Sequence, residues 1–246
     1  MVFNKQLRLG AQMIHKKLFS AGILAILLLT TFSVSLVSAF PNDVIREKTF
    51  VTYYGSGTGA GTDQYDVYAY DGIHWASGTT VTYTVNTKSA PTGSLNAVKA
   101  AFETWDAQIG DKLFNDNVAQ ASSNWVGNKH DGRNVVSWGR LGARIIAQTT
   151  VWYNPSTKEI SEFGMVFSTA YKWGIDSDGE LSGTVLVGKF DVQDIATHEA
   201  GHTLMLEDLY MDAASQLTMY GYGAYGQTYA RSLGLGDING IHAIYP

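Results

Sequence analysis

The pentapeptide His198-Glu199-Ala200-Gly201-His202 constrains this chain more than any other feature. On a helix, histidines four residues apart are turned by about 40° and separated by about 6 Å along the axis, so both imidazoles project from one face. That geometry lets two nitrogens bind one Zn²⁺ at about 2.0–2.1 Å each. Glu199 lies next to His198, where its carboxylate can take a proton from a water molecule. The spacing therefore predicts a zinc site with Glu199 as the general base.

A catalytic zinc site needs a third protein ligand, and the chain has no cysteine to supply one. Asp208 follows His198 by ten residues, but a continuous helix would turn Asp208 by about 240° from His202 and away from the metal. Asp208 reaches the metal only if the chain leaves helical geometry near Met205, and a left-handed Met205 costs about 1–2 kcal/mol. The other candidates for the third ligand are Glu207, Asp212, His130 and His242.

The N-terminal 39 residues have the pattern of a secretory signal peptide. Lys5, Arg8, Lys16 and Lys17 precede an apolar run over residues 18–37, which ends in small residues. We predict that residues 1–39 are a signal peptide and that the protein is secreted. The apolar run is nearly long enough to span a bilayer, so an uncleaved anchor on the outer face of the cell membrane is the alternative.

The remaining chain is acidic. Without residues 1–39 it loses four of 17 Lys and Arg residues and none of 22 Asp and Glu residues, which leaves a net charge of −9. This balance argues against nucleic acid as a partner, and we expect no membrane contact unless the anchor is retained. Because residues 55–62 are rich in glycine, we expect residues 40–65 to be a short flexible or pro-like segment and residues 66–246 to form one domain.

Periodicity places the motif among helices and strands. Apolar residues at spacings of three and four predict an amphipathic helix over residues 95–109, and Asp191 is suited to cap the helix that carries the motif. We expect the strands over residues 145–153 and 160–167 to pair in antiparallel fashion around a turn. Further strands are predicted over residues 65–70, 79–85 and 135–138.

An acidic stretch at residues 176–180 alternates acids around a glycine. Oxygen ligands at alternate positions suit Ca²⁺, so a Ca²⁺ site is one interpretation. The stretch lacks the full calcium-loop pattern, which favours a solvated turn.

Residues 198–210 follow the pattern H-E-x-G-H-x-L-x-L-x-D-x-Y and resemble the snapalysin and immune-inhibitor groups of secreted bacterial proteases. More broadly, the chain resembles a matrixin-like metzincin zinc metalloprotease, with Met205 and Asp208 in place of that family's Gly and third His. Met219 resembles the methionine of the Met-turn, and residues 231–245 resemble the C-terminal helix. The resemblance covers roughly residues 66–246 and favours Asp208 as the third zinc ligand, beside His198 and His202.

The resemblance implies an α+β catalytic domain with a twisted, mostly parallel five-stranded sheet, an antiparallel edge strand, two main helices and a C-terminal helix. It implies a monomeric zinc endopeptidase that acts on proteins or peptides, with residues 220–226 beside its substrate pocket. We expect the substrate to lie along an edge strand, for which residues 163–167 are the candidate. Two alternatives are an inactive extracellular binding protein of the same fold and a structural protein braced by zinc.

Overall fold

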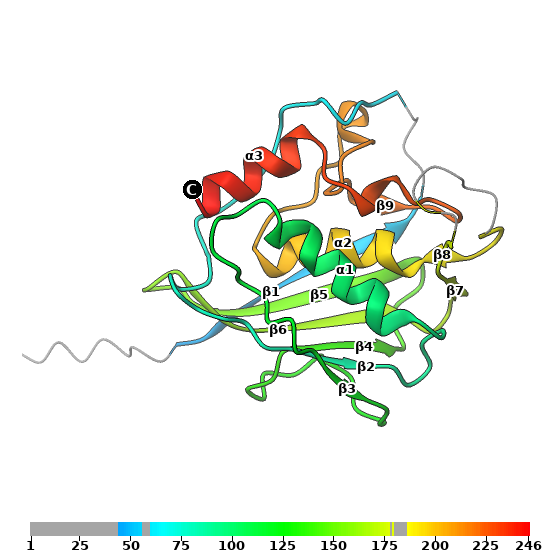
Figure 1. Ribbon diagram of the computed structural model, residues 1–246, viewed down its shortest axis with the longest axis horizontal. Helices are drawn as coiled ribbons and strands as arrows, with labels where there is room; N and C mark the ends of the chain where they lie inside the picture. Colours follow the sequence, from blue (N-terminus) through cyan, green and yellow to red (C-terminus); the bar gives the residue numbers. More distant parts are fainter. Residues whose placement is uncertain (1–43, 56–59, 178, 180–185) are drawn as a thin grey trace, which may run out of the picture. The chain divides into compact units, whose positions relative to one another are not determined.

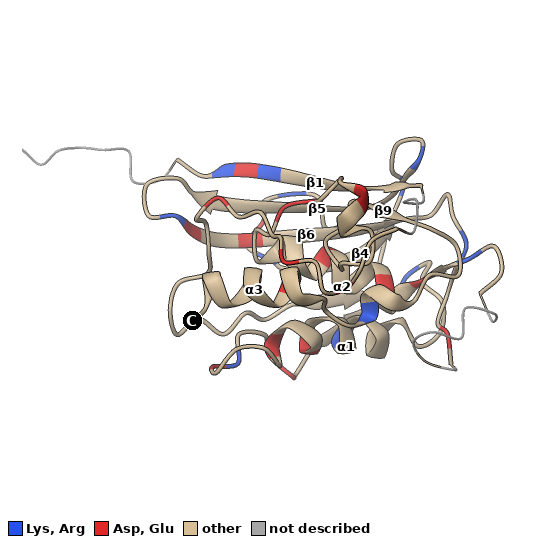
Figure 2. Cartoon of the chain, turned by 90° about the horizontal axis from the view of Figure 1, so that it is seen from above, with Lys and Arg blue, Asp and Glu red and all other residues tan. Residues whose placement is uncertain are grey.

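The computed structural model describes residues 44–55, 60–177, 179 and 186–246. The signal peptide predicted over residues 1–39 lies outside these residues. Figure 1 shows one large sheet with the three α-helices gathered on one side of it, and Figure 2, turned by 90°, shows the same arrangement. None of the helices in the described part of the chain has the length and apolar character that crossing a bilayer requires.

The described residues form two sheets and three α-helices. The helices are α1 (Ser94–Asp106), α2 (Val192–Thr203) and α3 (Leu235–Ile244), with short 3₁₀ turns η1 (Asp212–Ala214) and η2 (Tyr229–Arg231). The large sheet contains β1 (Arg46–Tyr54), β2 (Thr84–Asn86), β3 (Ala119–Ala121), β4 (Val135–Gly139), β5 (Ile145–Asn154), β6 (Glu159–Ser168) and β9 (Tyr222–Gly223). The small sheet pairs β7 (Trp173–Gly174) with β8 (Phe190–Asp191).

The large sheet is mostly parallel and becomes antiparallel toward one side. Its strand order is β3-β2-β4-β6-β5-β1-β9, and β5 runs antiparallel to both β6 and β1. The antiparallel pairing of β5 with β6 confirms the sequence prediction. The prediction of five strands was wrong, because β1 and β9 extend the sheet beyond β5. The choice of residues 163–167 as an edge strand was also wrong, because β6 lies between β4 and β5.

Strand β1 corrects the expectation that residues 40–65 are flexible. It pairs with β5 from Arg46 to Tyr53, interrupted by one irregularity near its end. Its residues alternate between buried and more exposed side chains at Phe50, Val51 and Thr52, as expected for a strand with one covered face. The sequence signal for β1 is this short run of β-branched and aromatic residues, which precedes the glycines.

Two other predicted strands differ from the structure. Residues 65–70 form no strand and make only an isolated bridge between Tyr70 and Leu206. This segment instead packs against α3. The carbonyl oxygens of Tyr65 and Val67 lie so close to Gly236 that a side chain at position 236 would collide with them. Of the strand predicted over residues 79–85, only the end lies in a strand, which is β2. Val81 forms one isolated bridge with Phe114.

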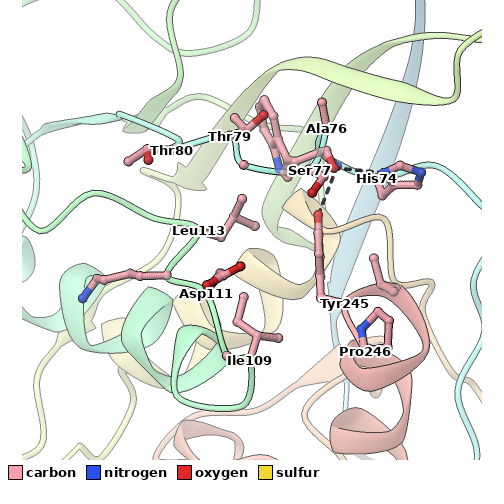
Figure 3. A pocket seen from close by; sticks show the side chains of 15 residues that line it. His74, Ala76, Ser77, Thr79, Thr80, Ile109, Asp111, Leu113, Tyr245 and Pro246 are labelled. Atoms are coloured by element: carbon pink, nitrogen blue, oxygen red, sulfur yellow. Dashed lines mark hydrogen bonds between the residues drawn. The ribbon is translucent and has the colours of Figure 1, made fainter.

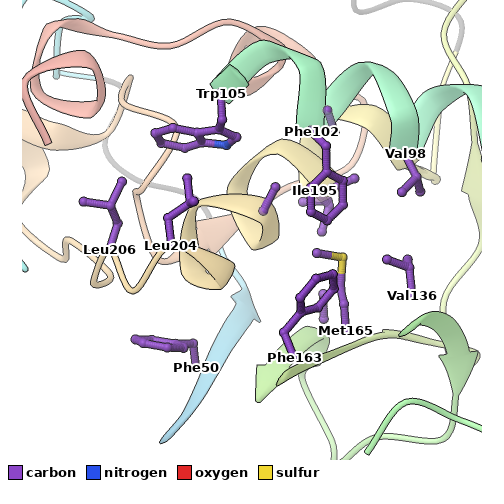
Figure 4. Close-up of a cluster of buried hydrophobic side chains, with 14 of the residues drawn as sticks. Phe50, Val98, Phe102, Trp105, Val136, Phe163, Met165, Ile195, Leu204 and Leu206 are labelled. Carbon is purple, nitrogen blue, oxygen red and sulfur yellow. The ribbon is translucent and has the colours of Figure 1, made fainter. Parts of the chain in front are cut away.

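The hydrophobic core lies between the sheet and helices α1 and α2. Figure 4 shows Phe102 of α1 facing Phe163 of β6, with ring centroids 5.8 Å apart. Trp105 is fully buried, and its indole N–H donates a hydrogen bond of 2.8 Å to the Thr197 carbonyl on α2. The side chains predicted to form the apolar stripe of the first helix therefore fix the position of α2, which carries the motif.

Candidate metal centre

Helix α2 begins where the sequence predicts. Asp191 has extended backbone angles, and its carboxylate accepts a hydrogen bond of 2.8 Å from the Asp194 N–H, which makes Asp191 the N-cap. Arg231 donates hydrogen bonds to both oxygens of Asp191, at 2.8 and 2.6 Å. The cap thus joins the start of α2 to the η2 turn and fixes the helix at its N-terminal end.

The two histidines of α2 present one nitrogen each to the same point. Nδ1 of His198 donates to the Thr218 carbonyl and Nδ1 of His202 donates to the Leu206 carbonyl, both at 2.7 Å. A carbonyl only accepts, so each Nδ1 carries a proton, and Nε2 is the nitrogen whose lone pair a neutral ring offers to a metal. The two Nε2 atoms lie 3.0 Å apart, and both side chains are buried. This arrangement is suited to metal binding.

The chain leaves helical geometry after α2, as it must for Asp208 to reach the two histidines. Helix α2 ends at Thr203, Met205 has a φ of 66°, and the Leu206 N–H returns to the Gly201 carbonyl at 3.2 Å. The turn brings Asp208 Oδ1 to 3.3 Å from Nε2 of both histidines. The prediction of a left-handed Met205 is confirmed.

Asp208, His198 and His202 form the one group among the described residues whose ligand atoms lie close enough to hold a metal ion. We call these three residues the ligand group. The buried Oδ1 atom of Asp208 has no hydrogen-bond partner, which is costly for a carboxylate unless a cation lies beside it.

The other candidates for the third ligand lie elsewhere. Glu207 forms an ion pair with Lys48, and Asp212 is exposed on η1. Nε2 of His130 lies 3.6 Å from Glu162, and Nε2 of His242 lies 2.8 Å from the Gln108 carbonyl. None of the four belongs to the ligand group.

The electrostatics of the ligand group favour a positive charge between its members. Burial opposes charge on His198, but the neighbouring Asp208 outweighs it and the pKa of His198 rises to about 9. Burial would raise the pKa of Asp208, yet His202 and His198 hold that pKa well below its usual range. A cation bound at this point would displace the proton that the raised pKa keeps on His198.

Glu199 lies beside the ligand group and is fully buried. One of its oxygens accepts a hydrogen bond of 2.6 Å from the Thr52 hydroxyl of β1, and the other accepts from the Thr149 hydroxyl of β5. The Phe50 ring of β1 stacks on His202 at 4.3 Å with an angle of 6° between the planes. Phe50, Thr52 and Thr149 were not predicted as site residues. The available signal was their place at alternate positions of β-branched runs.

The segment with Met219 packs against α2. Met219 is buried, and a side chain on Gly201 would collide with its sulfur and with Trp105. The Asp237 carboxylate on α3 accepts hydrogen bonds from the N–H groups of Thr218 and Met219, at 2.8 and 3.1 Å. Asp237 therefore fixes the carbonyl of Thr218 that orients His198.

Two other places in the described chain do not add to this centre. A cavity of about 700 Å³ near Trp75 and Tyr245 is drawn in Figure 3, and no residue of the ligand group lines it. In the acidic stretch at 176–180, residues 178 and 180 lie outside the described residues, so the Ca²⁺ interpretation stays a prediction.

Substitutions at Met205 should reverse the usual order of alanine and glycine. Met205 is fully buried, so removing its side chain costs about 2–5 kcal/mol, more than the 1–2 kcal/mol of left-handed strain that glycine relieves. Met205→Ala loses the side chain and keeps the strain. We expect the free energy of unfolding to fall in the order Met, Gly, Ala, with about 1 kcal/mol between Gly and Ala. Denaturant titration measures this order, and a more stable Ala variant would contradict it.

Asp194 should make stability depend on pH. Burial, with Asp191 nearby, raises the pKa of Asp194 from 3.8 to about 7. Between these values the folded chain holds a proton that the unfolded chain has lost, so stability falls as pH rises, by up to about 1.4 kcal/mol per pH unit. Asp194→Asn keeps an acceptor for the Ala230 N–H, so the difference in unfolding free energy between parent and variant should change between pH 5 and pH 8. An unchanged difference would refute this assignment.

No protein-family model matches the chain, and no curated protein matches it.

Proposed function

We propose that this chain is a secreted zinc-dependent endopeptidase of the metzincin-like, snapalysin-type class. The observation that carries the proposal is the ligand group, in which two Nε2 lone pairs and an unpartnered carboxylate oxygen converge beside Glu199. Two imidazoles and one carboxylate are a ligand set used by catalytic zinc, and three ligands leave a position for water. Imidazole ligands favour zinc over Ca²⁺ or Mg²⁺.

The sheet supports the metzincin-like assignment. When β1 and β9 are set aside, the order β3-β2-β4-β6-β5 remains, with β5 as an antiparallel edge strand. This agrees with the five-stranded sheet that the resemblance over residues 66–246 implies. The support from Met219 and Asp237 beneath α2 agrees with the proposed Met-turn.

The proposed mechanism assigns one role to each group. His198, His202 and Asp208 would hold the zinc, which when bound polarises the substrate carbonyl and makes water more acidic. Glu199 takes a proton from the attacking water and then delivers it to the leaving amine. The carbonyl groups of Thr218 and Leu206 keep both histidines in the tautomer that leaves Nε2 free. The peptide would add to the outer side of β5 through main-chain hydrogen bonds.

The remaining parts of the proposal concern context. The basic and apolar pattern of residues 1–39 supports export, the acidic remainder argues against nucleic acid, and we propose a monomer that acts on proteins or peptides. The alternative is an inactive extracellular binding protein of the same fold. The burial of Glu199 and the hydrogen bonds to both of its oxygens favour that alternative for the chain with β1 in place.

Metal removal tests the proposal. Because β1 covers Glu199, two forms of the protein are assayed. One is the intact chain, and the other is the chain cleaved at a peptide bond between the end of β1 and residue 62. We expect zinc-dependent casein hydrolysis that a chelator abolishes and added Zn²⁺ restores, with circular dichroism showing that the chelated protein stays folded. Absence of hydrolysis from both forms would overturn the endopeptidase proposal. Unfolding by the chelator would instead favour zinc that only braces the fold.

A further inference from the structure

Strand β1 fills the space between β5 and β9. It runs antiparallel to β5 along most of its length and parallel to β9 at Tyr53 and Tyr54. The Tyr53 N–H donates to the Gly221 carbonyl at 3.2 Å, and the Gly55 N–H donates to the Gly223 carbonyl at 3.1 Å. An extended peptide that adds to β5 would use the same kind of main-chain hydrogen bonds.

The two buried side chains of β1 contact the proposed catalytic machinery directly. Phe50 covers one face of His202, and Thr52 donates a hydrogen bond to Glu199. Both side chains are at most 4% exposed. A substrate cannot reach Glu199 or the outer side of β5 while β1 occupies this position.

Charge and aromatic contacts retain β1 at both ends. Lys48 forms ion pairs with Asp71 and with Glu207, the neighbour of Asp208, and Figure 2 shows the charged residues at the start of the strand. At the other end, Tyr54 contacts Tyr225 with ring centroids 5.0 Å apart. The side chains of these residues are partly exposed to water, and ion pairs in contact with water contribute little to stability. None of the residues in these contacts belongs to α1 or α2.

We propose that β1 is an internal inhibitor that occupies the peptide groove of this protein and must leave β5 before a substrate can bind. The inference rests on the proposed peptidase function. It also describes the substrate, which would be an extended segment with an aromatic side chain over His202 and a small side chain beside Glu199. When β1 leaves, the hydrogen-bonding groups of β5 become free for such a segment.

A reversible lock tests the inhibitor. The hydroxyl oxygens of Thr49 on β1 and Thr150 on β5 lie 3.0 Å apart, and the two residues are direct partners in the sheet. The chain has no cysteine, so Thr49→Cys with Thr150→Cys can form only one internal disulfide. A site-specific protease sequence inserted within residues 55–62 then allows β1 to be cut from the rest of the chain.

The cut, zinc-loaded protein should respond to the lock. We expect little hydrolysis of an unstructured peptide in the oxidised form and an increase of about tenfold or more after reduction, since a tenfold change corresponds to about 1.4 kcal/mol. The single Thr49→Cys variant, cut in the same way, should not respond to reduction. Equal activity in the oxidised and reduced forms would overturn the inhibitor and leave the peptidase in place. No zinc-dependent hydrolysis in either form would overturn both.

A peptide added in trans gives a second test that leaves the fold unchanged. A synthetic peptide with the sequence of residues 46–54 should inhibit the cut and reduced protein competitively, raising KM and leaving kcat unchanged. Replacing its residues that correspond to Phe50 and Thr52 by Ala and Val should weaken inhibition by about tenfold or more. Equal inhibition by both peptides would refute the assigned contacts.

Discussion

Glu199→Gln is expected to lower kcat for zinc-dependent peptide hydrolysis by about a hundredfold to ten-thousandfold, the range typical of a lost general base. The variant keeps the shape of the side chain and an oxygen that can accept from the Thr52 hydroxyl, so the fold and the ligand group should not change. A neutral amide cannot take the proton from water. Zinc content measured by mass spectrometry should equal that of the parent chain, which separates loss of the base from loss of the metal.

Glu103→Gln is the matched control for this experiment. Glu103 lies on α1, is about half exposed and forms an ion pair with Lys112. It has no role in the proposed mechanism. Its variant should hydrolyse peptides at the parental rate. Parental hydrolysis by Glu199→Gln, measured on the chain cut after β1, would remove Glu199 from the mechanism and leave the metal site in question.

Asp208→Ala is expected to lower zinc affinity by about a hundredfold or more, with hydrolysis lost in proportion. Losing even a residue that only orients a ligand costs about 10–100-fold in metal affinity, and Asp208 is placed to bind directly. The remaining histidines keep their carbonyl partners, so a weaker two-ligand site should persist. Competition with a coloured zinc chelator measures the change.

Asp212→Ala controls for a general loss of negative charge near the site. Asp212 lies four residues after Asp208 and is exposed on η1. Its variant should bind zinc as the parent chain does. Full zinc retention by Asp208→Ala would mean that another group supplies the third ligand.

The features that sequence reasoning predicted correctly are governed by local chemistry. The spacing of His198 and His202 fixes their common face once a helix forms, and Asp191 caps that helix through an N–H only three residues away. The left-handed Met205 followed from a simple geometric requirement, since no straight helix can return Asp208 to the histidines. These inferences needed only a few consecutive turns of chain.

The features that sequence reasoning missed depend on distant partners. Phe50 and Thr52 precede the motif by about 150 residues, and nothing in their local sequence identifies β5 as the neighbour of β1. The same gap explains the wrong edge strand, because β6 is covered only through its pairing with β4 and β5. The strand predicted over residues 65–70 was wrong for a related reason. Their carbonyl groups pack against Gly236 on α3, and a β-type sequence pattern does not reveal that contact.

The hydrogen bonds of Asp237 make the alignment of His198 depend on a helix that follows the motif in the chain. Asp237 on α3 binds the N–H groups of Thr218 and Met219, and the Thr218 carbonyl orients His198, so this support is synthesised after the motif. A nascent chain that ends before residue 237 therefore has the ligand group in its sequence without the support of Asp237. Such a shortened chain should align His198 less well than a chain that includes α3.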